Sequence, residues 1–249
     1  MTNGSICNSP KMYARVAGLL YLIVILLGFF AEGFVVNKLI VPNDSVSSAK
    51  NILAAPELWN LGCIANLIVL LCAIPVLWIE YQLLKPVNKS VVVLAVMFNM
   101  VSFSMEAISK LFYCLVLPVL TSPDYLKFFE GSQLQVIANI ALRSHDIAFY
   151  IALILFGVAC ILNGYLIFKS SYFPKVIGVL IQIAGICYIT AFSAILFFPL
   201  FADLITPIIF LPALVGESSF CLWLLIRGIN VKKWKERMEL ELKLSVEKI

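Results

Sequence analysis

The segment that decides the fold is Arg143-Ser144-His145-Asp146 together with the apolar run that follows it, IAFYIALILFGVACILNGYLIF, residues 147–168. None of the twenty-two residues in that run is charged. About 20 residues of α-helix, at a rise of 1.5 Å each, cross the roughly 30 Å hydrocarbon core of a bilayer. The run therefore predicts a membrane-spanning helix whose polar head, carrying the chain's single histidine, lies at one membrane face.

The composition of the whole chain is also typical of a membrane protein. Hydrophobic residues make up 62% of the 249 residues and charged residues 13%, and the mean hydropathy is +1.02. Soluble globular domains have about 45 to 50% apolar and about 25% charged residues. The partner that this composition predicts is the lipid bilayer. The net charge of +4 does not indicate nucleic-acid binding, because the basic residues lie in short loops and in the C-terminal tail.

Five further apolar segments are long enough to span a bilayer, so we predict an all-α integral membrane protein, a bundle of six transmembrane helices over residues 13–227. Residues 228–249 form a charged tail, in which Trp234, Met238 and Leu242 recur at four-residue steps and predict an amphipathic helix. The predicted spans cover residues 13–38, 58–84, 91–120, 134–168, 176–198 and 208–226.

The distribution of Lys and Arg predicts the orientation of the bundle. Thirteen basic residues fall on the side of the two termini, and three, Lys38, Lys50 and Lys127, fall in the loops of the opposite side. Short loops rich in Lys and Arg stay in the cytoplasm. Both termini, and the tail helix with them, are therefore expected to be cytoplasmic.

Two alternatives concern the N-terminal segment. Lys11 and Arg15, then Leu19–Phe30, then Ala31-Glu32-Gly33 have the order of a cleavable signal peptide, so processing of residues 1–33 stays open. The apolar run continues through Val36, however, which favours a retained first helix.

The similarity of residues 15–20 to residues 175–180 fits either an internal repeat or a shared pattern at the point where a helix enters the membrane.

Ionisable residues inside the predicted spans are the candidate functional residues. Charges are costly in lipid, so such residues face the interior of a bundle and often mark binding sites. At 1.5 Å per residue, Glu32 and Glu106 lie about 28 and 22 Å along their helices from the cytoplasmic side, in the outer half. We predict one water-accessible pocket open to the outer side. Its ligand-binding candidates are Glu32, Glu106, Lys110, Arg143, His145, Asp146 and Glu217.

A purely structural role for these charges is the competing interpretation. Glu106 and Lys110 are spaced to pair at i,i+4, and Arg143 and Asp146 at i,i+3, within their own helices. The sequence has no HExxH, GxSxG, P-loop or Rossmann fingerprint. The seven cysteines form no CxxC pair, which does not favour a metal site or a disulfide framework. No catalytic residue, metal or cofactor is therefore assigned.

These residues leave three hypotheses about function. The first is a membrane protein that binds or translocates a small polar or charged ligand through the predicted pocket. The second is a structural or accessory membrane protein that has no substrate of its own, and the third is an intramembrane hydrolase. Enzyme activity is not favoured, and the ligand, the coupling ion and the oligomeric state are left open.

An ordered set of short motifs resembles the domain-of-unknown-function family 4386, a family of small multi-pass prokaryotic membrane proteins. The resemblance extends over nearly the whole chain and implies a prokaryotic cell-membrane protein. It implies no established activity and supplies no catalytic residue. The motifs that carry it are residues 14–21 (ARVAGLLY), 49–54 (AKNILA), 84–89 (LKPVNK), 164–166 (GYL) with 173–175 (FPK), and 215–217 (VGE).

The predicted topology can be tested with reporter fusions. Fusions after Lys89, Lys175 and Ile249 should give cytoplasmic signals, because the basic bias of thirteen to three places these positions inside. Fusions near Asp44 and Asp124 should give external signals. A cytoplasmic signal at Asp124 would contradict the six-helix arrangement.

Overall fold

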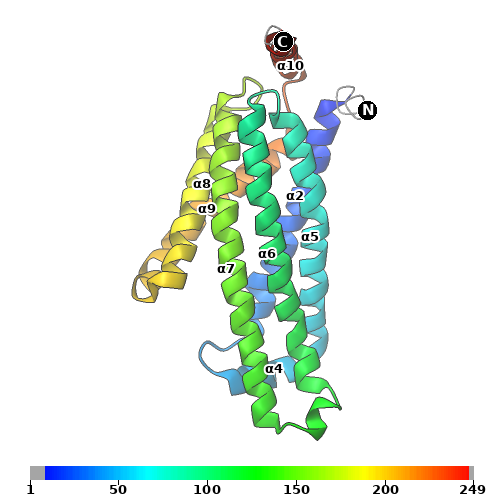
Figure 1. Ribbon diagram of the computed structural model, residues 1–249, viewed down its shortest axis with the longest axis vertical. Coiled ribbons are helices and arrows are strands. Elements are labelled where there is room, and N and C mark those ends of the chain that lie inside the picture. The colour runs from blue at the N-terminus through cyan, green and yellow to red at the C-terminus, as the bar shows by residue number, and fades with distance from the viewer. Residues whose placement is uncertain (1–8, 247–249) are drawn as a thin grey trace. The chain divides into compact units, whose positions relative to one another are not determined.

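The computed structural model describes residues 9–246, and within this range the side chains of 199–210, 242 and 244–246 are left out of the description. Over the described residues the chain is helical and forms no strand (Figure 1). Two of the elements are not α-helical: η1 is a π-helix and η2 a 3₁₀-helix. The elements are α2 (Pro10–Gly28), η1 (Phe29–Val36), α3 (Asn37–Leu39), α4 (Ser45–Ala54), α5 (Pro56–Leu84), α6 (Lys89–Thr121), η2 (Tyr125–Lys127), α7 (Gly131–Lys169), α8 (Lys175–Phe197), α9 (Pro199–Ile226) and α10 (Val231–Val246).

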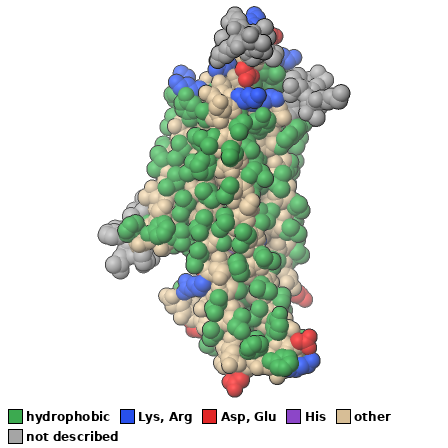
Figure 2. All heavy atoms as spheres, in the orientation of Figure 1, with side chains coloured by type: hydrophobic (Ala, Val, Ile, Leu, Met, Phe, Trp, Pro, Cys, Tyr) green, Lys and Arg blue, Asp and Glu red, His purple; other side chains and the backbone are tan. Residues whose placement is uncertain are grey.

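The protein is a helical multi-pass membrane protein, as predicted. Among the described residues, five helical segments are long and apolar enough to cross a bilayer. A sixth candidate consists of Leu211–Ile226 and Val231–Glu241, which are bent by 100° at the break between them. Large apolar side chains are exposed along these helices, for example Phe29 at 72% and Leu111 at 66%, and hydrophobic side chains cover most of the face seen in Figure 2. Such a surface suits lipid rather than water.

The helix bounds differ from the predicted spans mainly at α9. The predicted spans 176–198 and 208–226 leave residues 199–207 outside any helix, but α9 begins at Pro199 and continues to Ile226. Proline suits the first turn of a helix because its fixed φ is already helical and its missing N–H has no partner there. The fourth predicted span, 134–168, lies within α7, whose 39 residues extend over about 58 Å. That length exceeds a bilayer core, so part of α7 lies outside the hydrocarbon.

The chain divides into two compact units. Unit 1 comprises Met1–Leu22, Cys72–Ser102 and Leu153–Ile249, and unit 2 comprises Ile23–Leu71 and Phe103–Ala152. The first span and the helices α5, α6 and α7 each contribute residues to both units. Each unit contains its own set of buried polar side chains.

In unit 1, glycines bring α7 and α8 into backbone contact. Gly157 packs against Gly185, and Gly164 packs against Gly178, so that each helix presents two glycines seven residues apart. A Cβ added at Gly185 would lie 2.5 Å from the carbonyl oxygen of Gly157. Small residues allow such close approach, and dispersion contacts are the main attraction between helices in lipid.

The tail helix α10 is docked on unit 1. Trp234 is 1% exposed, and its indole N–H donates to the carbonyl of Leu83 at 3.1 Å. Arg237 donates to the carbonyls of Pro86 and Val87 at 3.1 and 3.2 Å. Gly228, at φ +66°, allows the sharp turn between α9 and α10. The hydrophobic stripe expected for this helix therefore packs in part against protein.

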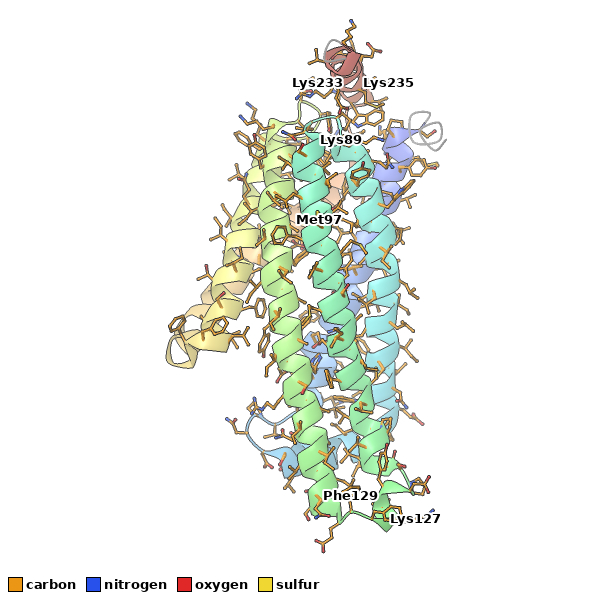
Figure 3. All side chains as sticks on the ribbon, viewed as in Figure 1. Lys89, Met97, Lys127, Phe129, Lys233 and Lys235 are labelled. Atoms are coloured by element: carbon orange, nitrogen blue, oxygen red, sulfur yellow. The ribbon has the colours of Figure 1, made fainter. Side chains whose placement is uncertain are left out.

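One end of unit 1 carries several of the lysines whose distribution predicts the orientation in the membrane. Figure 3 shows Lys89 at the start of α6 and Lys233 and Lys235 on α10 at the same end of the unit, whereas Met97 lies further along α6. Met97 is 60% exposed. A charged end that borders an apolar flank is the arrangement expected where a helix leaves a membrane.

Unit 2 has an apolar core around two stacked aromatic rings. The ring centroids of Trp59 on α5 and Tyr113 on α6 lie 4.1 Å apart, with 7° between their planes. The short helix α4 packs Ile52 into the same core. Asp44 caps α4 by accepting from the backbone N–H of Ser47 at 2.9 Å, and the hydrogen bonds from Ser47 lower the pKa of the exposed Asp44 carboxyl.

Replacement of Gly185 by alanine should destabilise the protein. The added methyl group meets the backbone of α7, and overpacking of this kind costs about 1 to 3 kcal/mol. Thermal unfolding in detergent micelles, followed by circular dichroism, measures the effect. Gly28→Ala is the matched control, because a Cβ there meets nothing within 4 Å, so better helix propensity should leave the melting temperature unchanged or raised. Equal melting temperatures for the two variants would show that the glycine contact is not tight.

Candidate functional site

Glu32 lies in the π-helical segment η1 (Phe29–Val36), in the last third of the 30-residue span Pro10–Leu39. A π-helix bonds residue i to i+5, so its wider turn points side chains in directions that an α-helix does not. Short π segments occur frequently at functional sites. The position of Glu32 in such a segment makes it the natural starting point for the site in unit 2.

The carboxylate of Glu32 forms an ion pair with Lys110 of α6. The Lys110 Nζ lies 2.7 Å from Glu32 Oε1, and the two side chains are 6% and 23% exposed respectively. The same ammonium group lies 3.9 Å from the ring centroid of Phe149 on α7, within the range of a cation–π interaction. Three elements of unit 2 therefore meet at Lys110.

His145 of α7 bridges the same carboxylate to α6. Its Nε2 lies 3.4 Å from Glu32 Oε2, and its Nδ1 lies 2.6 Å from Ser109 Oγ. The Ser109 hydroxyl also donates to the main-chain oxygen of His145 at 3.0 Å. His145 is 3% exposed and Ser109 fully buried. We call Glu32, Lys110, His145 and Ser109 the ionic network.

Two further acids of unit 2 border the ionic network and interact with it electrostatically. Glu106 is partly buried and interacts electrostatically with Lys110, Glu32 and His145. Asp146 is also partly buried and interacts with His145 and Arg143. The three carboxyl groups of Glu32, Glu106 and Asp146 outnumber the single buried ammonium group of Lys110, so the site favours a bound cation or protons over a bare anion.

Three buried polar groups of unit 2 have no hydrogen-bond partner. They are Trp59 Nε1, Asn66 Nδ2 and the Tyr113 hydroxyl, and all three residues are at most 1% exposed. Trp59, Gly62 and Asn66 are spaced at i, i+3 and i+7 and therefore share one face of α5. The Tyr113 hydroxyl faces this stripe, because a Cβ on Gly62 would lie 2.5 Å from its oxygen. We call Trp59, Asn66 and Tyr113 the unpaired donors.

The unpaired donors adjoin the ionic network through aromatic contact. The rings of Tyr113 and His145 meet edge to face, with centroids 5.3 Å apart. Since His145 also contacts Glu32, the donor stripe and the charged groups form one continuous polar region of unit 2. The ring of His145 thus contacts both Tyr113, one of the unpaired donors, and the carboxylate of Glu32.

Unit 1 contains a second buried acid site. Glu217 of α9 is 6% exposed; its Oε2 accepts a hydrogen bond from the Tyr21 hydroxyl, and its Oε1 accepts one from the Cys160 thiol at 3.6 Å. Glu80 of α5 accepts from Asn163 at 3.4 Å and interacts electrostatically with Glu217. Neutral donors, rather than a cation, hold Glu217 in place.

The structure brings together part of the predicted seven-residue cluster. Glu32, Lys110 and His145 are in direct contact, with Glu106 and Asp146 close to them. Lys110 pairs with Glu32, not with its helix neighbour Glu106. Arg143 donates to Asn43 at 3.0 Å, and Glu217 has its partners in unit 1. Convergence of all seven residues on one pocket stays a prediction.

Sequence reasoning missed several residues of these sites. Ser109, Tyr21 and Cys160 are ordinary residue types inside apolar helices, so nothing in their local sequence marks them. Aromatic residues such as Trp59 and Tyr113 usually indicate core packing when they occur in a helix. Asn66 carried a weak signal, since an amide within a span needs a partner. Among the described residues, no group of three or more His, Cys, Asp or Glu side chains is arranged to hold a metal ion.

Comparison with known proteins gives a family but no activity. The model of a family described as "Domain of unknown function (DUF4386)" matches residues 16–228. A similar protein from Archaeoglobus fulgidus, named "Uncharacterized protein", is 40% identical over 91 residues, which are 34% of this chain and 52% of that protein. The chain therefore spans about half the length of this relative. No solved structure matches the chain.

A double-mutant cycle tests the Glu32–Lys110 pair. Lys110→Met and Glu32→Gln should each destabilise the protein by roughly 3 to 5 kcal/mol, because each strands a buried charge. The double variant should lose less than the sum of the two single losses. Unfolding free energies of the four proteins in mixed micelles give the coupling.

The exposed pair Asp124–Lys127 provides the control for this cycle. Its nitrogen and oxygen lie 2.8 Å apart, but the side chains are 80% and 65% exposed, so Asp124→Asn with Lys127→Met should show a coupling of at most about 1 kcal/mol. Additive losses at Glu32 and Lys110 would mean that the ion pair does not hold the folded protein together.

Proposed function

We propose that the protein, which belongs to the family described as domain of unknown function DUF4386, binds a small polar ligand in unit 2. The ligand would bind at the unpaired donors, beside the ionic network. Translocation of that ligand is the function we infer from binding inside a membrane-spanning region. We also propose that the protein lies in the cell membrane with both termini cytoplasmic, which the bias of the basic residues favours.

The observation that carries this proposal is the set of unpaired donors. A buried donor without an acceptor costs about 1 to 3 kcal/mol, and a bilayer has no water to supply the missing bond. Three such groups on two facing helices, all at most 1% exposed, would together be a large penalty for a protein with no ligand. A ligand that brings oxygen acceptors would satisfy the indole, amide and phenol groups at once.

The charged groups beside the donors indicate which ligands are favoured. The donors select carboxylate, phosphate or carbonyl oxygens, whereas Glu106 and Asp146 favour a positive group on the same molecule. Glu32 and Lys110 already neutralise each other at 2.7 Å. A small molecule that carries both an oxygen acceptor and a cationic group, such as a zwitterion, fits both sets of residues.

A hydrolase is the alternative that one specific geometry favours. Ser109, His145 and Glu32 are connected in the order hydroxyl, imidazole and carboxylate, at 2.6 and 3.4 Å, which resembles the arrangement of a serine nucleophile, its base and the orienting acid. The Ser109 hydroxyl, however, also donates to the backbone oxygen of His145, and Ser109 is fully buried. Ligand binding accounts for these contacts and also for the unpaired donors, so we favour it.

A structural or accessory role is the other hypothesis, and the ion pair alone would fit it. Buried ion pairs contribute little net stability compared with apolar packing. A structural role offers no reason to keep the indole, amide and phenol groups unpaired in the same region. Replacement of the Asn66 amide is therefore the most direct way to distinguish ligand binding from a structural role.

Asn66→Leu should separate ligand binding from a structural role. If a ligand accepts from Asn66, small molecules that copurify with the wild-type protein and are identified by mass spectrometry should be depleted at least tenfold in the variant. The ligand-free variant should be at least as stable as the wild type, because it no longer buries an unpaired amide.

Asn99→Leu is the matched control. Asn99 is also buried, at 3% exposed, but it donates to the carbonyl of Ala95 within its own helix. This variant should retain the copurifying molecule. A more stable Asn66→Leu protein, with no molecule enriched in the wild type, would refute ligand binding and leave the structural role.

A further inference from the structure

A groove on the surface of unit 1 lies outside all of the sites described above. It encloses about 360 Å³ and is lined by Tyr165, Phe168 and Lys169 of α7 and by Val179, Gln182, Ile183 and Ile186 of α8. The volume falls within the range of small-molecule sites, about 300 to 1,000 Å³. None of its lining residues belongs to the ionic network, the unpaired donors or the Glu217 site.

The α7–α8 groove has an elongated apolar part. On α8 its lining residues Val179, Ile183 and Ile186 follow at i, i+4 and i+7, two turns of one helix face or about 10 Å. Ile183 and Ile186 are 40% and 56% exposed, so the groove opens to the surroundings of the protein. In a membrane protein these surroundings are lipid chains, which suit such a surface.

Two ammonium groups lie at one end of the groove. The Nζ of Lys169, the last residue of α7, lies 5.9 Å from the ring centroid of Tyr165, and the Nζ of Lys175, the first residue of α8, lies 5.6 Å from that of Phe168. Both of these rings line the groove. From Ile147 to Phe197 the sequence contains no Asp or Glu, so the part of α7 that lines the groove and the whole of α8 supply no acid to neutralise the lysines.

Gln182 adds one polar group among the apolar residues of α8, and the start of α8 adds to the positive charge near the two lysines. Gln182 lines the groove and donates to the carbonyl of Gly178 at 3.1 Å. Pro174 precedes α8 without a side-chain cap, and its first turn contains no acid, which leaves helix N–H groups and the positive end of the dipole directed toward a phosphate. The groove therefore combines an elongated apolar surface with positive charge at one end. A ligand that fits it needs an apolar chain and an anionic group.

We propose that the α7–α8 groove binds an anionic glycerophospholipid, with the phosphate at Lys169 and Lys175 and an acyl chain along Ile183 and Ile186. Basic pockets between transmembrane helices bind acidic headgroups in this way. A zwitterionic lipid fits less well, because its own cationic group would face two lysines. A free phosphate would use the lysines but leave the apolar part empty.

Native mass spectrometry of the purified protein in detergent tests the proposal. Dioleoyl phosphatidylglycerol should be retained in preference to dioleoyl phosphatidylcholine. Lys169→Gln with Lys175→Gln should weaken retention of phosphatidylglycerol by about fivefold for each lysine removed and abolish the preference. Ile186→Trp, which fills the groove, should reduce retention of phosphatidylglycerol while both lysines remain.

Matched variants at other positions of unit 1 control for charge and bulk. Lys85→Gln with Lys89→Gln removes two basic charges from the α5–α6 turn and should leave retention unchanged. Leu94→Trp adds the same bulk to an exposed position on α6, where Leu94 is 44% exposed, and should also have no effect. Equal losses in the two double-lysine variants, or equal retention of the two lipids by the wild type, would overturn the proposal.

Cross-linking provides a second measurement that needs no variant. A phosphatidylglycerol with a photoreactive acyl chain should label peptides that contain residues 165–186, and unlabelled phosphatidylglycerol should compete with it. Labelling spread evenly over all spans would overturn the proposal, as would full competition by glycerol phosphate, which lacks acyl chains. Neither result depends on the ligand proposed for unit 2, because the groove and that site share no residue.

Discussion

The ion pair between Lys110 and Glu32 is the contact on which the polar interior of unit 2 depends. An ammonium group at a side-chain exposure of 6% cannot be solvated by lipid, so the protein must supply its counter-charge. The carboxylate of Glu32 does so at 2.7 Å, and the ring of Phe149 covers the ammonium group at 3.9 Å. The π-helical turn at residues 29–36 carries Glu32, which contacts Lys110 of α6 and His145 of α7.

Both units bury an acidic side chain, but different groups hold it in place. In unit 2 a cation balances an acid, and His145 and Ser109 extend the network by hydrogen bonds. In unit 1 the carboxyl group of Glu217 is held by a phenol and a thiol, and glycine contacts between α7 and α8 supply the packing. A network of charges responds strongly to an added ion or ligand, whereas apolar glycine contacts do not. We assign ligand binding to unit 2 because the three unpaired donors lie there beside these charges.

Membership of a family without a described activity leaves the function to be argued from the site. The most informative groups there are those that the protein leaves unsatisfied. Trp59, Asn66 and Tyr113 retain unpaired donors at almost complete burial, while the members of the ionic network are paired with one another. A membrane interior offers no water to share these bonds, so the unpaired groups mark where another molecule belongs.

The sequence by itself determined that the chain is helical and membrane-embedded, and where most helices run, because length and hydropathy are properties of continuous segments. It also identified the charged residues, since any charge within an apolar run stands out. Only the tertiary structure decided their partners. The spacing of Glu106 and Lys110 favours a pair within one helix, yet Lys110 binds Glu32, 78 residues away. Partner choice depends on how each helix is rotated about its axis and packed against its neighbours. For the same reason the contacts of Tyr21, Cys160 and Ser109, and the docking of Trp234, became visible only in the folded chain.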